Sequence, residues 1–155
     1  QVAQDSSFTI RRADGPADMN AIYEFLRARE TLRAKMVEPK AKTGIAATIR
    51  EGLAFIIERD GAMIGTAGLF RAPWWYSDES AFFSKWFHIA EEARDTRVVE
   101  AVIEEFYDLA ETEQEPVFIH VLKGGDVSKF SARAAQEYAL FPSGRIAAIH
   151  PKAEG

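Results

Sequence analysis

Two histidines, His88 and His120, are the side chains of this sequence best suited to acid-base chemistry. An imidazole changes its protonation state near neutral pH, so it can take a proton from a nucleophile under ordinary conditions. Each histidine lies in an apolar stretch that predicts a strand, where a packed structural role is the alternative. Two histidines with no carboxylate cluster beside them do not predict a metal site.

A second candidate lies at the start of a predicted helix. The run consists of Arg94, Asp95, Thr96, Arg97, Val98 and Val99. The N–H groups and the positive dipole end at a helix start favour an anion, and a guanidinium binds phosphate bidentately. Asp95 opposes this because its carboxylate competes for the same N–H groups. The alternative is a capped surface helix flanked by solvated arginines.

A third candidate is the aromatic run Trp74, Trp75 and Tyr76, in a loop between two predicted strands. Adjacent exposed aromatic side chains are typical of a surface that binds a substrate or a protein partner. The alternative is that they cap the core or cover a sheet edge.

The composition predicts one globular domain. Of 155 residues, 47% are hydrophobic and 28% charged, and we expect a domain at 8–150 with tails at 1–7 and 151–155. The absence of cysteine excludes disulfides, thiolate zinc sites and a cysteine nucleophile. The net charge of -5 argues against direct binding of nucleic acid. No apolar run approaches the roughly 20 residues that span a bilayer, and the start lacks a secretory signal, so we expect a cytoplasmic protein with no membrane partner.

Hydrophobic periodicity and turn residues predict an α/β (α+β) fold, with one mixed sheet and helices on its faces. Strands are expected at 8–12, 53–58, 63–70, 81–89, 116–122 and a last one ending at Ile149. Helices are expected at 18–33, 45–52, 96–111 and 126–138, the last with an apolar stripe that includes Tyr138. The basic stretch 35–42, which contains Pro39, is expected to be a loop.

Local turn signals refine this outline. Asp60-Gly61 predicts a two-residue hairpin turn. Gly65 and Gly68 lie inside the following strand, which indicates a bulge or a close approach by another backbone.

Three stretches resemble the GNAT superfamily of N-acetyltransferases. FTIRRADGPADMNAIYEFL resembles its first strand and helix, and AFIIERDGAMIGTAGL its central hairpin. KWFHIAEEARDTRVVEAVIEEFYDLAETEQEPVFIHV is similar to its cofactor-binding strand, loop, helix and next strand. The run from Arg94 to Val99 looks most like a phage-borne branch. The resemblance covers nearly the whole chain and implies a mostly antiparallel sheet in which the parallel fourth and fifth strands splay apart.

The resemblance implies acetyl-CoA as the cofactor and a small-molecule or protein amine as the acceptor. The backbone of His88, Ile89 and Ala90 would bind the pantetheine, and the loop from Arg94 to Val99 would hold the pyrophosphate. That loop departs from the family pattern because it contains no glycine, which lets a backbone approach phosphate closely.

The catalytic residues of the family match less well. His88 and His120 would flank the thioester as candidate bases, since the family's glutamate position holds about Ser84. The family's acid is a tyrosine whose position holds Gln136, and Tyr138 is the nearby candidate, with a place at the core edge as the alternative.

Two functions remain open. One is an acyl-CoA-dependent N-acetyltransferase. The other is an inactive GNAT-shaped binding or assembly protein, associated with a virion if the phage resemblance holds. A homodimer is as plausible as a monomer.

Overall fold

The strands of this protein form one sheet in which every strand lies beside its neighbour in sequence. The computed structural model describes residues 7–28, 35–93, 96–122, 135–141 and 145–149. The strands are β1 (Thr9–Arg12), β2 (Ala54–Arg59), β3 (Ala62–Pro73), β4 (Ser80–Ile89), β5 (Val117–Leu122), β6 (Ala135–Phe141) and β7 (Arg145–Ile149), in the order β1-β2-β3-β4-β5-β6-β7. The pairs are antiparallel except β4–β5, which is parallel. This confirms the expected mixed, mostly antiparallel sheet.

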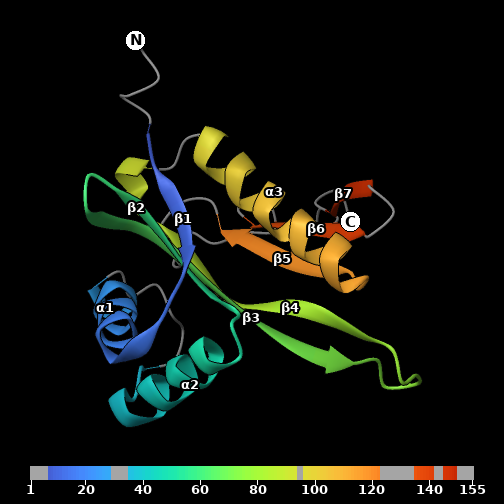
Figure 1. The fold of residues 1–155 in the computed structure, drawn as a ribbon, viewed down its shortest axis with the longest axis horizontal. Helices are drawn as coiled ribbons and strands as arrows, with labels where there is room; N and C mark the ends of the chain where they lie inside the picture. Colours follow the sequence, from blue (N-terminus) through green and yellow to red (C-terminus); the bar gives the residue numbers. More distant parts are fainter. Residues whose placement is uncertain (1–6, 29–34, 94–95, 123–134, 142–144, 150–155) are drawn as a thin grey trace.

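The helices cover both faces of the sheet (Figure 1). They are α1 (Gly15–Ala28), α2 (Glu38–Arg50) and α3 (Thr96–Glu113). α1 and α2 lie side by side on one face, and α3 lies on the other. On the α3 face, the ring of Phe106 meets Phe55 of β2 at 5.2 Å and Phe87 of β4 at 6.3 Å between centroids.

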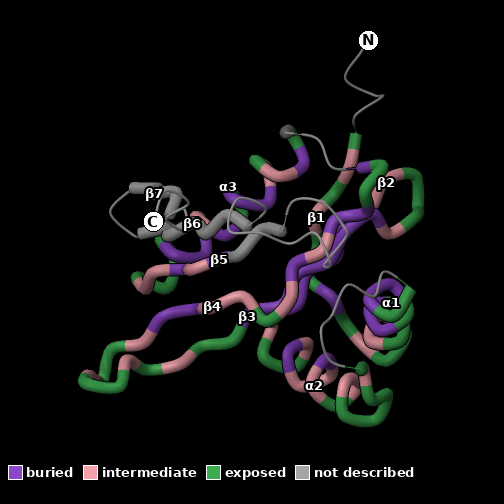
Figure 2. Tube along the Cα trace, turned by 180° about the vertical axis from the view of Figure 1, so that it is seen from behind, coloured by how far each residue is buried: buried purple, intermediate pink, exposed green. Residues whose placement is uncertain are grey.

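The core follows from the periodicity of the elements. Val98, Val102, Phe106 and Ala110 recur at four-residue spacing on α3, and all four are buried. The first residues of β2 are buried on both faces because helices cover the sheet on each side. Figure 2 shows buried residues along β2 and the middle of the sheet, and exposed residues toward the far end of the β3–β4 hairpin.

The hairpin turn between β2 and β3 is confirmed. Asp60 has a φ of 54° and Gly61 a φ of 78°. Two consecutive residues with positive φ match the twist of the flanking strands, and Gly accepts this conformation without a Cβ clash.

The loop expected at 35–42 is wrong over most of its length. α2 begins at Glu38, with Pro39 in its first turn. A proline there loses no hydrogen bond, because the first N–H groups of a helix have no partner within it. Proline therefore marks the start of this helix.

The last predicted helix is wrong at its C-terminal end. Residues 123–134 lie outside the described residues, and Ala135–Phe141 form β6. Tyr138 therefore lies on a strand, paired with Ile119 of β5 and Ala148 of β7. Pairing on both sides satisfies the backbone of this apolar segment and overrides its helical spacing.

Candidate functional site

The parallel strands β4 and β5 are joined at one end. Their described register consists of Phe82 with Val117 and Phe83 with Phe118, and the N–H of Phe82 donates to the carbonyl of Pro116 at 2.9 Å. β4 stays paired with β3 on its other side as far as Ile89. Within the described residues, the second half of β4 therefore has no register partner on β5.

A bulge in β4 lies where the two strands separate. Gly68 of β3 pairs with Trp86 and the next residue, Leu69, pairs with Ser84, so Lys85 is the extra residue. A bulge bends its strand and increases the local twist. The ammonium of Lys85 donates to Thr48 Oγ1 of α2 at 2.9 Å, which ties the bulge to that helix. The bulge therefore lies at the base of the divergence.

Gly68 lies against the indole ring of Trp86. A Cβ at Gly68 would lie 2.4 to 2.5 Å from three ring carbons of Trp86. The indole Nε1 donates to Thr66 Oγ1 at 3.0 Å, and that hydroxyl donates to the carbonyl of Phe55 at 2.9 Å. Of the two alternatives that the glycine predicted, the bulge is found, on the partner strand, whereas the group that approaches Gly68 is a side chain and not another backbone.

The register also decides which backbone groups of β4 face the divergence. The N–H of Ala90 donates to the carbonyl of Ile64 at 2.7 Å, so Ala90 turns its backbone toward β3. Backbone direction alternates along an antiparallel strand, so His88 does the same while Phe87 and Ile89 face the β5 side. Of the three residues expected to bind pantetheine, only Ile89 has this direction, and the sequence did not single out Phe87.

The histidines lie on the two diverging strands. His88 pairs with Thr66, is partly buried, and lies on the face opposite α3, because its neighbour Phe87 packs against α3. His120 lies on β5 and pairs with Glu137 of β6. The third catalytic candidate, Tyr138, lies on β6, one strand beyond His120.

The predicted phosphate loop is described in part. A short 3-10 turn, η2 (Glu91–Ala93), follows β4, and α3 begins at Thr96. Arg94 and Asp95 lie outside the described residues. Arg97 is exposed, Val98 is fully buried in the core, and Val99 packs at its margin.

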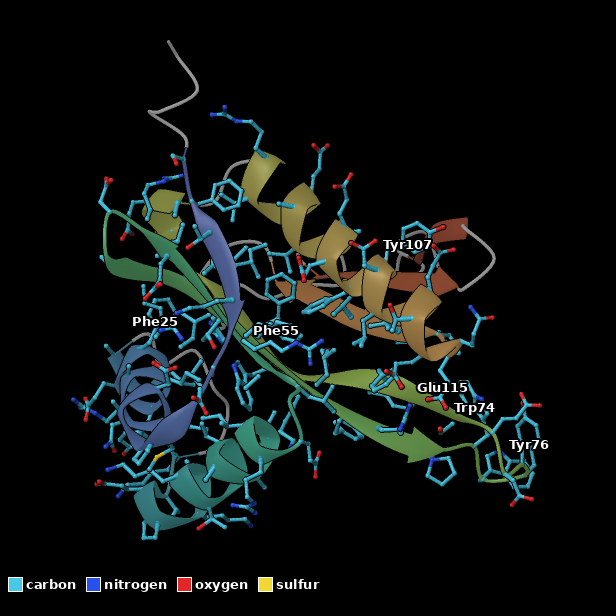
Figure 3. All side chains as sticks on the ribbon, viewed as in Figure 1. Phe25, Phe55, Trp74, Tyr76, Tyr107 and Glu115 are labelled. Carbon is cyan, nitrogen blue, oxygen red and sulfur yellow. The ribbon has the colours of Figure 1, made fainter. Side chains whose placement is uncertain are left out.

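The aromatic loop between β3 and β4 divides into two parts. Trp74 is half-buried, and its ring meets Phe83 at 5.9 Å and Phe118 at 5.8 Å between centroids. Trp75 and Tyr76 are 94% and 69% exposed. Figure 3 shows Tyr76 at the far end of the hairpin and Trp74 nearer to Glu115, which follows the end of α3. Trp74 therefore covers the sheet, whereas its two neighbours form an exposed aromatic surface.

Among the described residues, no group of three or more His, Asp or Glu side chains is placed to hold a metal ion. In the same part of the chain, no helix is both long and apolar enough to cross a membrane.

The bulge at Lys85 and the backbone direction of Phe87 were missed at the level of sequence. In the sequence, Gly68 was the one indication of these features. A glycine leaves room for a neighbouring ring, but it does not identify which ring fills that room. Strand alternation predicts faces, and a single inserted residue reverses that alternation without any change in composition.

No protein-family model matches the chain, and no curated protein sequence matches it. A GNAT family acetyltransferase from Staphylococcus aureus is similar in structure, with a TM-score of 0.56 and 12% identity over 81% of this chain and 92% of that chain. NAA60 from Arabidopsis thaliana, in complex with a bisubstrate analogue, gives 0.57 and 14% identity over 75% of each chain. A predicted acetyltransferase from Clostridium acetobutylicum, solved with acetyl-CoA, gives 0.54 and 12% identity over 70% of this chain and 77% of that chain. The described elements, with their parallel β4–β5 pair, therefore adopt the fold of the GNAT acetyltransferases.

Proposed function

We propose that this protein is an acyl-CoA-dependent N-acetyltransferase that transfers an acetyl group to the amine of a small molecule or a protein. The observation that carries the proposal is the divergence of β4 from β5 beyond Phe83, with the bulge at Lys85 at its base. It leaves backbone N–H and C=O groups of β4 directed toward β5, where an extended ligand could bond to them as a strand would.

In this proposal acetyl-CoA is the cofactor, and when bound it would supply the thioester that donates the acetyl group. In this proposal the backbone of Phe87 and Ile89 would bond to the pantetheine. The segment from Arg94 to Val99 would hold the pyrophosphate through the N-terminal N–H groups of α3, and Arg97 would add a guanidinium. Val98 is compatible with this because its side chain is buried in the core.

The proposed base is His88. Its position on β4 supports the proposal, because a neutral imidazole beside the divergence can accept the proton that the acceptor amine loses. His120 on β5 is the second candidate for this role. We propose that Tyr138 is the acid that protonates the departing thiolate. It would do so from β6 rather than from a helix.

A second candidate function is supported by a different observation. Trp75 and Tyr76 are exposed at the end of a long hairpin, and the Arg94–Val99 loop contains no glycine. An exposed aromatic pair is typical of a protein interface. The alternative proposal is therefore a GNAT-shaped binding or assembly protein without acyl transfer, in a phage particle if the resemblance of that loop holds, and in the cytoplasm otherwise.

Titration calorimetry with acetyl-CoA tests the first function. We expect a dissociation constant on the order of micromolar, and a thermal stabilisation that grows with cofactor concentration. Arg97→Gln should weaken binding roughly tenfold, because a charge-assisted phosphate contact is lost. Arg50→Gln, an exposed arginine at the end of α2, is the matched control and should bind like the native chain. No heat and no stabilisation at about millimolar cofactor would reject acyl transfer and leave the second function.

A further inference from the structure

The β3–β4 hairpin projects beyond the three described helices (Figure 1). Its tip, residues 75–79, lies between the end of β3 and the start of β4. Trp75 and Tyr76 are the most exposed large hydrophobic side chains of the described chain. Large aromatic side chains dominate the energetics of protein interfaces, so two adjacent rings left in water indicate a surface for a partner.

The exposed rings are held by ring contacts that continue into the sheet. The ring of Tyr76 stacks on that of Trp74, with 6.4 Å between centroids and 21° between planes. Trp74 meets Phe83 and Phe118 edge to face, and those two rings stack on each other at 5.5 Å. The rings of the tip are therefore preorganised, and a partner that binds them orders few additional side chains.

Trp75 adds a second ring direction to the tip. Its plane lies at 79° to that of Tyr76, with centroids 5.4 Å apart. Because Trp75 is almost fully exposed, the faces of its indole ring are open to solvent. The face of an aromatic ring carries the negative part of its quadrupole and attracts a cation, and an indole does so most strongly.

The same tip is acidic. Asp78 and Glu79 follow the two aromatic residues and are both exposed. The sequence contains no lysine, arginine or histidine between Arg71 and Lys85. Within the described ranges, neither carboxylate forms an ion pair. The ring faces and the carboxylates of the tip therefore favour the same kind of group, a cation.

The two cations that flank this stretch are engaged elsewhere. Arg71 donates from Nη2 to Glu113 and from Nε to Glu115, each at 2.9 Å, so its charge is matched at the end of α3. Lys85 donates to Thr48 of α2. Neither side chain neutralises the tip, and a cation that does so has to come from a partner.

We propose that the tip binds a basic segment of a protein partner. Its lysine or arginine side chains lie on the faces of Trp75 and Tyr76 and beside the carboxylates of Asp78 and Glu79. A second copy docked tip to tip would bring like charges together, and a nucleic acid would bring phosphates, so both fit less well. The proposal names the partner class of the second candidate function and rests on it, whereas acetyl transfer does not require it.

Three capped hexapeptides test the proposal on the native chain by NMR titration. They consist of Gly-Arg, Gly-Gln or Gly-Glu repeats, and they differ in side-chain charge. We expect the Gly-Arg peptide to shift the indole N–H resonance of Trp75 with a dissociation constant on the order of 0.1 to 1 mM. It should bind at least roughly fivefold more tightly than the Gly-Gln peptide.

Three results of this titration would overturn the proposal. The first is no shift of the Trp75 resonance at about 5 mM Gly-Arg peptide. The second is equal binding of the Gly-Arg and Gly-Gln peptides. The third is a shift by the Gly-Glu peptide alone, which would leave the tip as an interface but exclude a basic partner.

Two variants separate the rings from the charges. Trp75→Ala should weaken binding of the Gly-Arg peptide about five- to tenfold, because a cation–π contact is lost. The double variant Asp78→Asn with Glu79→Gln should weaken it about fivefold, with a larger effect at low salt. These three side chains are exposed, so we expect both variants to fold. Unchanged affinity in both would contradict the proposal.

Glu104→Gln with Glu105→Gln is the matched control, because these exposed carboxylates lie on α3, outside the tip. It should leave the response of Trp75 to the Gly-Arg peptide unchanged. A Trp75 resonance that moves on dilution of the native chain alone would place a second copy on the tip and reject the basic partner. Acetyl-CoA titration of the same samples reports the proposed enzymatic function separately.

Discussion

Gly68 and Trp86 illustrate how a single residue shapes the site. The indole ring occupies the place of the missing side chain at Gly68, and its N–H reaches the hydroxyl of Thr66 across the strand pair. The two residues therefore hold the end of the β4 bulge against β3. Both the ring contact and the hydrogen bond depend on glycine at this position.

Substitution of Gly68 should destabilise the fold. In Gly68→Ala the new Cβ overlaps the ring of Trp86, so the indole must move and its bond to Thr66 is lost. We expect a loss of about 1 to 3 kcal/mol in the free energy of unfolding, measured by urea denaturation.

The control is Gly44→Ala in α2, where a Cβ would have nothing within 4 Å. It should be neutral or raise stability by up to about 1 kcal/mol, because alanine favours a helix. A double variant with Trp86→Ala should show strong coupling between Gly68 and Trp86. Additive losses would mean that the ring does not exclude a Cβ at Gly68.

At the scale of elements, Arg11 joins a helix to two strands. Its guanidinium on β1 lies 2.7 Å from Asp18 of α1 and 3.1 Å from Glu58 of β2. The N–H of Asp14 also donates to Asp18, at 2.8 Å. The hydrogen bonds from Arg11, together with that from Asp14, hold the pKa of the Asp18 carboxyl below its ordinary value. The charged form of Asp18 therefore stabilises the docking of α1 on the sheet.

This predicts a pH-dependent effect of Asp18→Asn. The pKa of Asp18 is lower in the folded than in the unfolded state, so its charged carboxylate stabilises the fold. This stabilisation is complete above about pH 5 and is lost as the pH falls through the folded-state pKa. The variant should therefore be less stable than the native chain by about 1 kcal/mol at pH 7. The difference should shrink below about pH 4. Thermal unfolding of both proteins across this range measures it.

Asp78→Asn serves as the control, since Asp78 is an exposed carboxylate in the β3–β4 loop. Its effect should be small at every pH. A penalty for Asp18→Asn that stays constant down to about pH 3 would show that the shape of the side chain, rather than its charge, is what α1 requires.

At the scale of the whole molecule, the sheet has a narrow junction. β1 to β4 and β5 to β7 are connected by the two described register pairs between β4 and β5. The helix α3 reinforces this junction, because it contacts β5 and β6 while its fully buried Phe106 meets Phe55 of β2 and Phe87 of β4. Packing of α3 therefore compensates for the backbone pairing that the divergence gives up.

Phe106→Ala should weaken the coupling between the two parts of the sheet. We expect a loss of about 3 to 5 kcal/mol, the usual range for a buried phenylalanine. We also expect tryptophan fluorescence and far-UV circular dichroism to give unequal unfolding midpoints, because the three tryptophans all lie between β3 and β4 or on β4. Glu105→Ala, an exposed neighbour on α3, should change stability by less than about 0.5 kcal/mol. Coincident midpoints in Phe106→Ala would show that the sheet unfolds as one unit without this contact.

Local signals predicted the elements as far as β5, but not all of their ends and not the strand β6. The two positive φ angles at Asp60 and Gly61 follow from residue chemistry, so the hairpin was predictable. Pro39 was misassigned because a proline fits both a loop and the first turn of a helix. Tyr138 was misassigned because a short apolar segment fits either period until strands pair on both sides of it.

The sequence by itself determined the α+β class and the strand and helix order as far as β5, because periodicity and turn chemistry act between near neighbours. It also marked Gly68 as the place of a bulge or a close approach. Only the tertiary structure decided that β4 bulges at Lys85 and that Phe87 and Ile89 turn their backbone toward β5. These features depend on the register between distant strands, and one inserted residue changes that register without changing any local pattern.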